Sequence, residues 1–218
     1  MSLTTQLAAV YDGFQKNAPQ PVLEVINSSK QGFQKAFDPS LAIQVGDKLP
    51  AFSLSNAVGE VVTSASLLSK GPLLITFYRG EWCPFCNLAL QALQKRLDDF
   101  KAKGVTLVAI TPELPNTSLS TVEKNELKFQ VLSDVGNKFA KELGILFPMP
   151  DPMRPVLKSF GHDLLAANGD DSYVVPVPAT LLVDGKGVVR NTYINPDYTK
   201  RIEPSVTLEW IDALAGSE

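Results

Sequence analysis

The chain has 218 residues, of which 44% are hydrophobic and 20% are charged, and its 20 Lys and Arg against 23 Asp and Glu give a formal net charge of −3. These values predict one large domain, or one domain with an appended arm, and exclude a disordered chain, a collagen-like repeat and a coiled-coil rod. No basic cluster and no run of about 20 apolar residues is present, so we expect neither a nucleic-acid nor a membrane partner. No basic segment precedes an apolar stretch at the amino terminus, which favours a cytoplasmic location.

An amino-terminal arm is expected over residues 1–41. Apolar residues recur there at helical spacing from Leu3 to Phe37, with prolines in the middle, which predicts two helices. Short strands separated by turn residues begin near Leu49, so the globular domain is expected over residues 42–218. The arm either caps this domain or joins two subunits in a homodimer.

A βαβ unit is predicted at the centre of the domain. The run PLLITFY, which includes Leu73–Tyr78, is almost entirely apolar and indicates a central strand buried on both faces. A helical stripe of apolar residues follows until the break at Lys101–Gly104, and a second apolar strand covers Val105–Ile110. Such a unit places its two strands parallel in one sheet.

The alternation of helices and strands continues beyond this unit. Residues around 148–174 are rich in Pro, Asp and Gly and predict a surface insertion with one helix near Pro155–Phe160. The other predicted elements are a helix over Thr121–Lys128, a strand over Phe129–Leu132, a helix over Asn137–Leu143, a hairpin of Ala179–Asp184 with Val188–Tyr193, and a closing helix over Leu208–Leu214.

Cys83 and Cys86 are the two cysteines of the chain, and they lie where the central strand gives way to a helix. With Cys83 as the N-cap and Pro84 at the first helical position, Cys86 is the third helical residue. Both sulfurs then lie near unpaired amides at the positive end of the helix dipole, which lowers the thiol pKa. A pKa of about 8.5 leaves about 3% thiolate at pH 7, whereas a pKa of about 6 gives about 90%. The pair can also close into a disulfide, so the spacing indicates a two-electron thiol cycle.

Two structural explanations of the cysteine pair remain beside this redox interpretation. Cysteine is a common small core residue, and C-x-x-C can be half of a zinc site. A structural zinc ion usually needs four N or S ligands, and the chain adds only His162 to the two cysteines. We therefore expect no metal and no cofactor, and we expect His162 to be a surface or hydrogen-bonding residue.

Pro178 precedes the buried strand that begins at Ala179. A proline there either simply starts the strand or makes a rigid turn through a cis bond, and the composition leaves the isomer open. A rigid turn would bring exposed backbone next to the cysteines and guide an incoming disulfide.

The segment FYRGEWCPFC, Phe77–Cys86, resembles thioredoxin-fold proteins and in particular the peroxiredoxin-like branch of the alkyl hydroperoxide reductase/thiol-specific antioxidant family. The resemblance covers about residues 42–216 and implies an α/β thioredoxin-like fold with a central mixed sheet flanked by helices. Four further segments are similar to this family: Val45–Leu54, Val131–Asp134, Pro176–Asp184 and Asn195–Arg201.

The resemblance implies a thiol-dependent peroxidase that reduces hydrogen peroxide or organic hydroperoxides. On the family pattern P-x-x-x-T-x-x-C, Cys86 falls on the peroxidatic cysteine, Cys83 on the threonine and Arg79 on the proline. Cys86 thiolate is then expected to attack the peroxide, and Cys83 to capture the sulfenic acid as a disulfide that thioredoxin or another dithiol reduces.

Departures from the family pattern keep two alternatives open. The family's second arginine lies on a late strand, and the aligned residues here are Pro178-Ala179-Thr180, as in thioredoxin-like reductases. A general thiol–disulfide oxidoreductase, in which Cys83 is the more exposed cysteine and attacks first, is one alternative, and a non-catalytic interaction domain is the other.

Two residues beside the cysteines are expected to shape the site. Arg79 either stabilises a thiolate or developing oxyanion or forms a surface ion pair with Glu81. Trp82 is expected to shield one side of the site.

Overall fold

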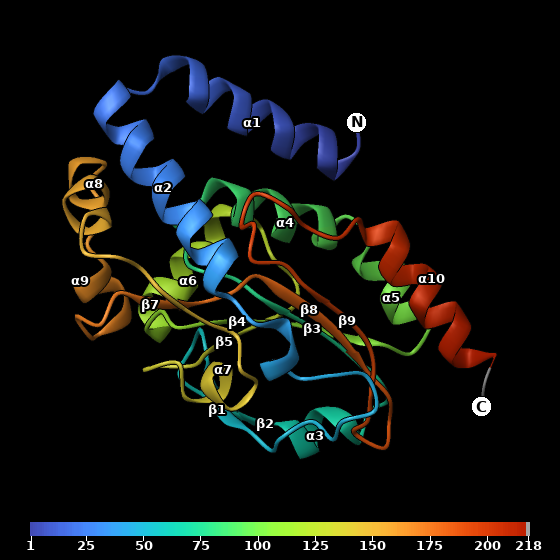
Figure 1. Cartoon of the computed structure of the whole chain (residues 1–218). Coiled ribbons are helices and arrows are strands. Elements are labelled where there is room, and N and C mark those ends of the chain that lie inside the picture. Colours follow the sequence, from blue (N-terminus) through green and yellow to red (C-terminus); the bar gives the residue numbers. More distant parts are fainter. Residues whose placement is uncertain (217–218) are drawn as a thin grey trace.

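A seven-stranded mixed sheet forms the core of the computed structural model, which describes residues 1–216 (Figure 1). The central strand β3 (Leu73–Phe77) lies between β4 (Thr106–Thr111), to which it is parallel, and β8 (Ala179–Val183), to which it is antiparallel. All five residues of β3 are buried. The predicted central strand and βαβ unit are therefore confirmed. The order in the sheet is β2 (Val61–Thr63), β1 (Ser53–Asn56), β5 (Gln130–Ser133), β4 (Thr106–Thr111), β3 (Leu73–Phe77), β8 (Ala179–Val183) and β9 (Val189–Ile194).

Helices cover both faces of the sheet (Figure 1). Outside the insertion around residues 148–174, the helices of the domain are α3 (Ser64–Leu68), α4 (Pro84–Gln94), α5 (Leu97–Ala102), α6 (Pro115–Lys124), α7 (Lys138–Glu142) and α10 (Pro204–Ala215). Leu74 of β3 packs with α4, α5 and α10 on one face, whereas Ile75 packs toward α3 and α7 on the other. Within residues 1–216 none of the helices is long and apolar enough to span a bilayer.

Three predicted helices differ clearly in their bounds from the observed ones. The closing helix α10 begins at Pro204, before the predicted Leu208, and ends at Ala215. The single helix predicted up to Lys101 is observed as two helices, α4 and α5, because residues 95–96 between them are not helical. Helix α6 begins at Pro115, before the predicted Thr121, because proline suits the first helical position.

The arm consists of α1 (Leu3–Asn17), α2 (Gln20–Ala36) and the short helix η1 (Pro39–Leu41), so the two predicted helices are confirmed. Helix α1 packs over α4 and buries Leu3 and Leu7 in one cluster with both cysteines. The Glu203 carboxylate accepts the backbone N–H groups of Leu3 and Thr4, which satisfies amides at the start of α1. The arm thus caps the domain of its own chain, while the domain bounds and the homodimer stay predictions.

The predicted insertion around residues 148–174 contains two helices, α8 (Met153–Ser159) and α9 (Leu164–Asn168), so the expectation of one helix is incomplete. Strands β6 (Leu146–Pro148) and β7 (Val174–Pro176) pair antiparallel at its base. The insertion is anchored in the core rather than lying loosely on the surface, and its buried apolar residues are Met149, Met153, Val156, Leu157, Leu164 and Tyr173.

Candidate active site

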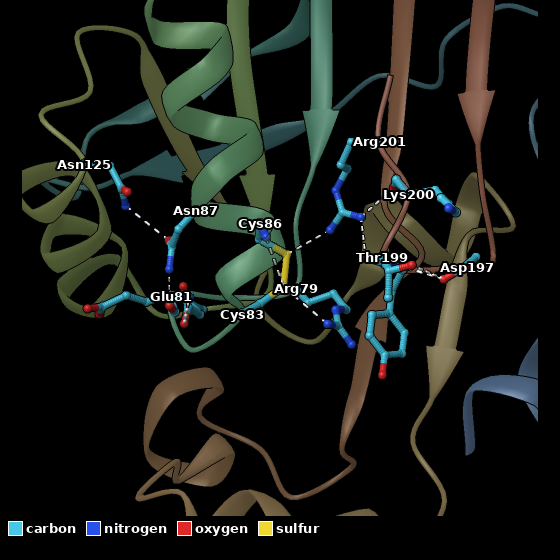
Figure 2. Close-up of a disulfide and its surroundings, with 12 residues drawn as sticks. Arg79, Glu81, Cys83, Cys86, Asn87, Asn125, Asp197, Thr199, Lys200 and Arg201 are labelled. Carbon is cyan, nitrogen blue, oxygen red and sulfur yellow. Dashed lines mark hydrogen bonds between the residues drawn. A yellow bond between two sulfur atoms is a disulfide. The ribbon is translucent and has the colours of Figure 1, made fainter. Parts of the chain in front are cut away.

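The cysteine pair lies at the start of α4, directly behind the central strand (Figure 2). Cys83 is the N-cap, Pro84 occupies the first helical position, and the backbone N–H of Cys86 donates to Cys83 Sγ at 3.2 Å. Cys83 and Cys86 form a disulfide. The predicted helix start, with its amides beside the sulfurs, is therefore present.

Both cysteines are completely buried, with 0% of either side chain exposed. The expectation that Cys83 is the more exposed of the two is wrong, because α1 and the start of α4 cover the pair with apolar side chains such as Leu7 and Phe85. A reagent therefore reaches either sulfur only after a local movement of the side chains that cover the pair.

Two arginines donate hydrogen bonds to the two sulfurs (Figure 2). Arg79 Nη2 lies 3.3 Å from Cys83 Sγ, and Arg201 Nη2 lies 3.2 Å from Cys86 Sγ. Burial lowers the pKa of Arg79 to about 10, and burial together with the charge of Arg79 lowers the pKa of Arg201 to about 9. Both groups remain cationic at pH 7, so each sulfur faces a positive charge.

The guanidinium of Arg79 is stacked between two aromatic rings. It lies 4.0 Å from the ring centre of Tyr198 and 4.8 Å from that of Trp82, and only 4% of Arg79 is exposed. The alternative of a surface ion pair between Arg79 and Glu81 is wrong, because Arg79 is buried and Glu81 pairs with Lys124 at 3.2 Å. Trp82 flanks the site, on the side of Arg79.

Arg201 was not among the residues that the sequence singled out. It follows β9 in a turn in which the Asp197 carboxylate accepts the N–H and the hydroxyl of Thr199. Arg201 Nη1 donates to the carbonyl oxygens of Tyr198 and Lys200, which orients its other nitrogen toward Cys86. A second arginine is thus present, although it does not lie on the late strand where the family pattern places it.

Gly80 lies in the loop that leads into α4, and Glu113 packs against this loop. Gly80 has φ +148°, and a Cβ there would overlap Trp82 Nε1 and lie 2.7 Å from Glu113 Oε1. Oε1 of Glu113 accepts the backbone N–H of Glu81 at 2.9 Å, and burial raises the pKa of Glu113 to about 7. Sequence reasoning missed Glu113, because one carboxylate after a strand carries no local signal.

Pro178 does not offer free backbone beside the cysteines. No peptide bond among residues 1–216 is cis, so the bond before Pro178 is trans. Pro178 is buried, its carbonyl oxygen accepts from the N–H of Asn195, and the N–H of Val177 donates to Ile145. The proposed docking of a disulfide on this turn is not supported, since these backbone groups already have partners.

Two other residues of interest lie apart from the sulfurs. Thr180 is buried within β8, where its Oγ1 lies 3.4 Å from Oγ1 of Thr76 in the neighbouring strand. His162 is half-buried, its ring centre lies 6.2 Å from that of Trp82, and burial together with Lys124 lowers its pKa. Neither is therefore assigned a chemical role.

A family model supports the resemblance that the motif indicates. Residues 45–192 match the model of the AhpC/TSA family. The chain belongs to the AhpC/TSA family. The matched AhpC/TSA region contains both cysteines and Arg79, whereas the two arm helices, Tyr198 and Arg201 lie outside it.

Curated relatives of this AhpC/TSA chain are named peroxiredoxins. It is 32% identical over 103 residues to a putative peroxiredoxin bcp of Buchnera aphidicola, covering 47% of this chain and 65% of the relative. It is 27% identical over 153 residues to peroxiredoxin Q, chloroplastic, of Populus jackii, covering 70% of this chain and 61% of the relative. The chain thus spans less than two thirds of the length of these two relatives.

Solved peroxiredoxin structures share the fold of this AhpC/TSA chain. Peroxidoxin BcpB from Mycobacterium tuberculosis superposes with a TM-score of 0.60 at 18% identity, covering 79% of this chain and 98% of that one. The reduced 2-Cys peroxiredoxin of Plasmodium vivax gives 0.62 at 23% identity, covering 80% and 83%. The expected thioredoxin-like fold with a central mixed sheet is therefore confirmed.

Proposed function

We propose that this AhpC/TSA protein is a thiol-dependent peroxidase that reduces hydrogen peroxide or organic hydroperoxides. The observation that carries the proposal is the pair of arginine hydrogen bonds, from Arg79 to Cys83 and from Arg201 to Cys86. A guanidinium beside a sulfur favours the thiolate over the thiol, and the thiolate is the nucleophile. The peroxiredoxin names of the relatives support the same activity.

Cys86 is the residue proposed to attack the peroxide. Its thiolate forms a bond to one peroxide oxygen, the O–O bond breaks, and the other oxygen gains a proton and leaves as an alcohol or water. Cys86 thereby becomes a sulfenic acid. Arg201 is proposed to stabilise first the thiolate and then the negative charge that develops on the leaving oxygen.

Cys83 is proposed to resolve this intermediate. Its sulfur bonds to the sulfur of Cys86, the sulfenic oxygen leaves as water, and the disulfide forms. The N-cap and third helical positions place the two sulfurs close enough for this step without breaking the helix. Thioredoxin or another dithiol then reduces the disulfide to two thiols and is itself oxidised.

A reducing compartment, the cytoplasm, is proposed as the location. The chain has two cysteines, three residues apart, and such a short link is suited to a redox cycle rather than to stabilising a secreted domain. A homodimer is proposed as well, and sedimentation of the purified chain tests it.

The experiment that tests the peroxidase proposal compares the wild type with Cys83→Ser and Cys86→Ser. Peroxide consumption is followed with a dithiol reductant, and a sulfenic-acid trap is analysed by mass spectrometry. We expect Cys86→Ser to consume no peroxide. Without the reductant, we expect Cys83→Ser to reduce peroxide once per chain and to accumulate the trapped sulfenic acid on Cys86, because the resolving sulfur is absent.

Three outcomes would contradict the proposal. Sulfenic acid on Cys83 would reverse the two roles. Rapid reduction of a protein disulfide with negligible peroxide turnover would select the thiol–disulfide oxidoreductase. Two thiols with an ordinary pKa of about 8.5 and no reaction with peroxide would select a non-catalytic domain.

A further inference from the structure

Helix α1 of the arm lies over the cysteine pair (Figure 1). It packs across α4, and its residues Leu3 and Leu7 belong to the same buried cluster as Cys83 and Cys86. Neither cysteine side chain is exposed to solvent. Because α1 lies outside residues 45–192, which match the family model, this cover is an addition to the matched region.

The contact between α1 and the domain is loosely packed. Of the 15 residues of α1, Leu3 and Leu7 are buried. Cavities of about 440, 360 and 270 Å³ lie along the helix, between the arm and the domain. Voids remove the dispersion contacts that hold an element in place, and elements with few buried apolar contacts open at a low cost in free energy. Helix α1 can therefore leave the domain before the rest of the chain unfolds.

Polar contacts hold α1 near its two ends. At the amino-terminal end, the Glu203 carboxylate accepts the backbone N–H groups of Leu3 at 3.2 Å and Thr4 at 2.7 Å. Near the carboxyl-terminal end, the side-chain amides of Gln15 and Asn27 exchange hydrogen bonds of 3.1 and 3.2 Å. The second contact joins α1 to α2, whereas the first joins it to the domain. Glu203 consequently holds the start of α1 on the domain.

The residues between α1 and α2 can serve as a hinge. Ala18 and Pro19 are extended there, with ψ of 147° and 140°, and belong to neither helix. Beyond them α2 is anchored, because the ring of Phe33 packs on that of Phe147 in β6 with the ring centres 4.1 Å apart. Rotation at residues 18–19 would lift α1 off the disulfide and leave α2 in place.

The two halves of the proposed thiol cycle use reagents of very different size. Hydrogen peroxide has two heavy atoms and needs only small side-chain movements to reach a sulfur. A protein dithiol must bring a cysteine on its own surface to bonding distance of a sulfur of the disulfide. Helix α1 stands between such a protein and the two sulfurs.

We propose that α1 is a lid over the disulfide, and that this lid must open before a protein dithiol can reduce the disulfide. The inference rests on the proposed peroxidase function and adds a control on its reductive half. In the open state a thiolate of the dithiol bonds to one sulfur, the S–S bond breaks, and the other cysteine leaves as a thiolate and takes up a proton. The second thiol of the dithiol then loses its proton, bonds to the first and releases the remaining cysteine as a thiol, so that the dithiol is oxidised.

The helical structure of α1 favours the closed lid. Isolated helices of about 12–15 residues are marginal in water, so α1 loses helical structure when it leaves the domain. Gly13 lies within α1 with open space around it, and alanine there favours the helix and therefore the closed state. Removal of the Glu203 carboxylate favours the open state, because two amides at the helix start lose their acceptor.

The experiment measures the rate constant for reduction of the oxidised chain by a low concentration of thioredoxin in the wild type, Glu203→Ala and Gly13→Ala. We expect Glu203→Ala to speed this reduction by about threefold or more, and Gly13→Ala to slow it by about threefold. Two matched controls should leave the rate constant unchanged. They are Glu209→Ala, at an exposed position of α10, and Gly32→Ala, in the anchored helix α2 with open space around it.

Two further measurements separate opening of the lid from other effects. Amide hydrogen exchange of α1, followed by mass spectrometry, should change by the same factors as the reduction by thioredoxin, because both report the open population. Oxidation of the reduced proteins by hydrogen peroxide, followed by stopped flow, should have the same rate constant in the wild type and all four variants. A parallel change in the peroxide rate would overturn the assignment of the lid to the reductant.

The remaining outcomes are distinguishable. Faster exchange of α1 in Glu203→Ala with unchanged reduction by thioredoxin overturns the lid, because the dithiol then reaches the sulfurs with α1 closed. Equal changes in the reduction by dithiothreitol and by thioredoxin, without any change in exchange, assign the effect to the disulfide itself and also overturn the lid. Reduction that follows the opening of α1, in a protein that hydrogen peroxide does not oxidise, supports the lid and overturns the peroxidase proposal.

Discussion

The guanidinium of Arg201 lies 3.2 Å from the sulfur of Cys86, although 115 residues separate the two in the chain. The carbonyl oxygens of Tyr198 and Lys200 hold the guanidinium in this position. A charged hydrogen bond of this kind stabilises a thiolate more than a thiol. The contact therefore identifies Arg201 as the group most directly placed to act on the proposed peroxidatic sulfur.

Replacing Arg201 with Gln is expected to raise the pKa of the reduced Cys86 thiol and to slow peroxide reduction at pH 7 by about a hundredfold. Thiolate ultraviolet absorbance as a function of pH gives the pKa, and stopped-flow peroxide consumption gives the rate constant. Lys200→Gln is the matched control, because it removes an exposed adjacent charge whose side chain does not donate to the sulfur. Equal effects of the two substitutions would indicate a general loss of charge rather than this contact.

Arg79→Gln is expected to make the disulfide harder to reduce, because the Cys83 thiolate released on reduction loses its charged hydrogen bond. A loss of about 1.4 kcal/mol corresponds to a reduction potential lower by about 30 mV, measured by equilibration with a dithiol redox buffer. Arg154→Gln is the control, since Arg154 stacks on Tyr173 at 4.3 Å in the insertion. An unchanged potential in Arg79→Gln would mean that Arg79 does not stabilise the thiolate.

Gly80→Ala is expected to lower the free energy of unfolding by about 2 kcal/mol or more. An alanine at position 80 would have to adopt φ +148°, which residues with a Cβ rarely do. Its Cβ would also clash with Trp82 Nε1 and Glu113 Oε1. Gly13→Ala serves for comparison, because Gly13 lies within α1 with open space around it, and alanine there should stabilise by about 0.5–1 kcal/mol. Urea unfolding of the oxidised proteins measures both, and a neutral Gly80→Ala would show that the loop relaxes freely.

Glu113 is expected to make stability depend on pH. Its pKa is about 7 in the folded chain against an ordinary value of 4.5, so the folded state binds more protons than the unfolded state between these two pH values. The contribution of Glu113 to the free energy of unfolding therefore falls by at most about 3 kcal/mol as pH rises from about 4.5 to 7. Above pH 7 it stays constant.

Glu113→Gln tests this dependence. Urea unfolding at pH 5 and pH 8 gives the free energy of unfolding of both proteins. The value for the variant minus the value for the wild type should be more positive at pH 8 than at pH 5. Glu123→Gln is the control, since Glu123 is an exposed carboxylate on α6. A wild-type-to-variant difference that is the same at pH 5 and pH 8 would contradict the raised pKa of Glu113.

Local sequence determined the central strand, the start of α4 and the two helices of the arm. The strand β3 follows from a short, almost entirely apolar run, which is typical of a strand buried on both faces. The helix start follows from Cys83-Pro84, because N-cap and first-turn preferences depend on a few adjacent residues. Short elements such as α9, five residues long, carry too little periodicity to be predicted in this way.

Tertiary structure decided which side chains meet the sulfurs and what covers them. Arg201 contacts Cys86 because the turn after β9 lies beside the start of α4. Both cysteines are buried because α1 packs across α4. Neither event leaves a local pattern, because long-range contacts depend on how separate elements pack and not on the spacing within any of them. The motif thus determined the thiol pair itself, while packing of distant segments decided its charge and its burial.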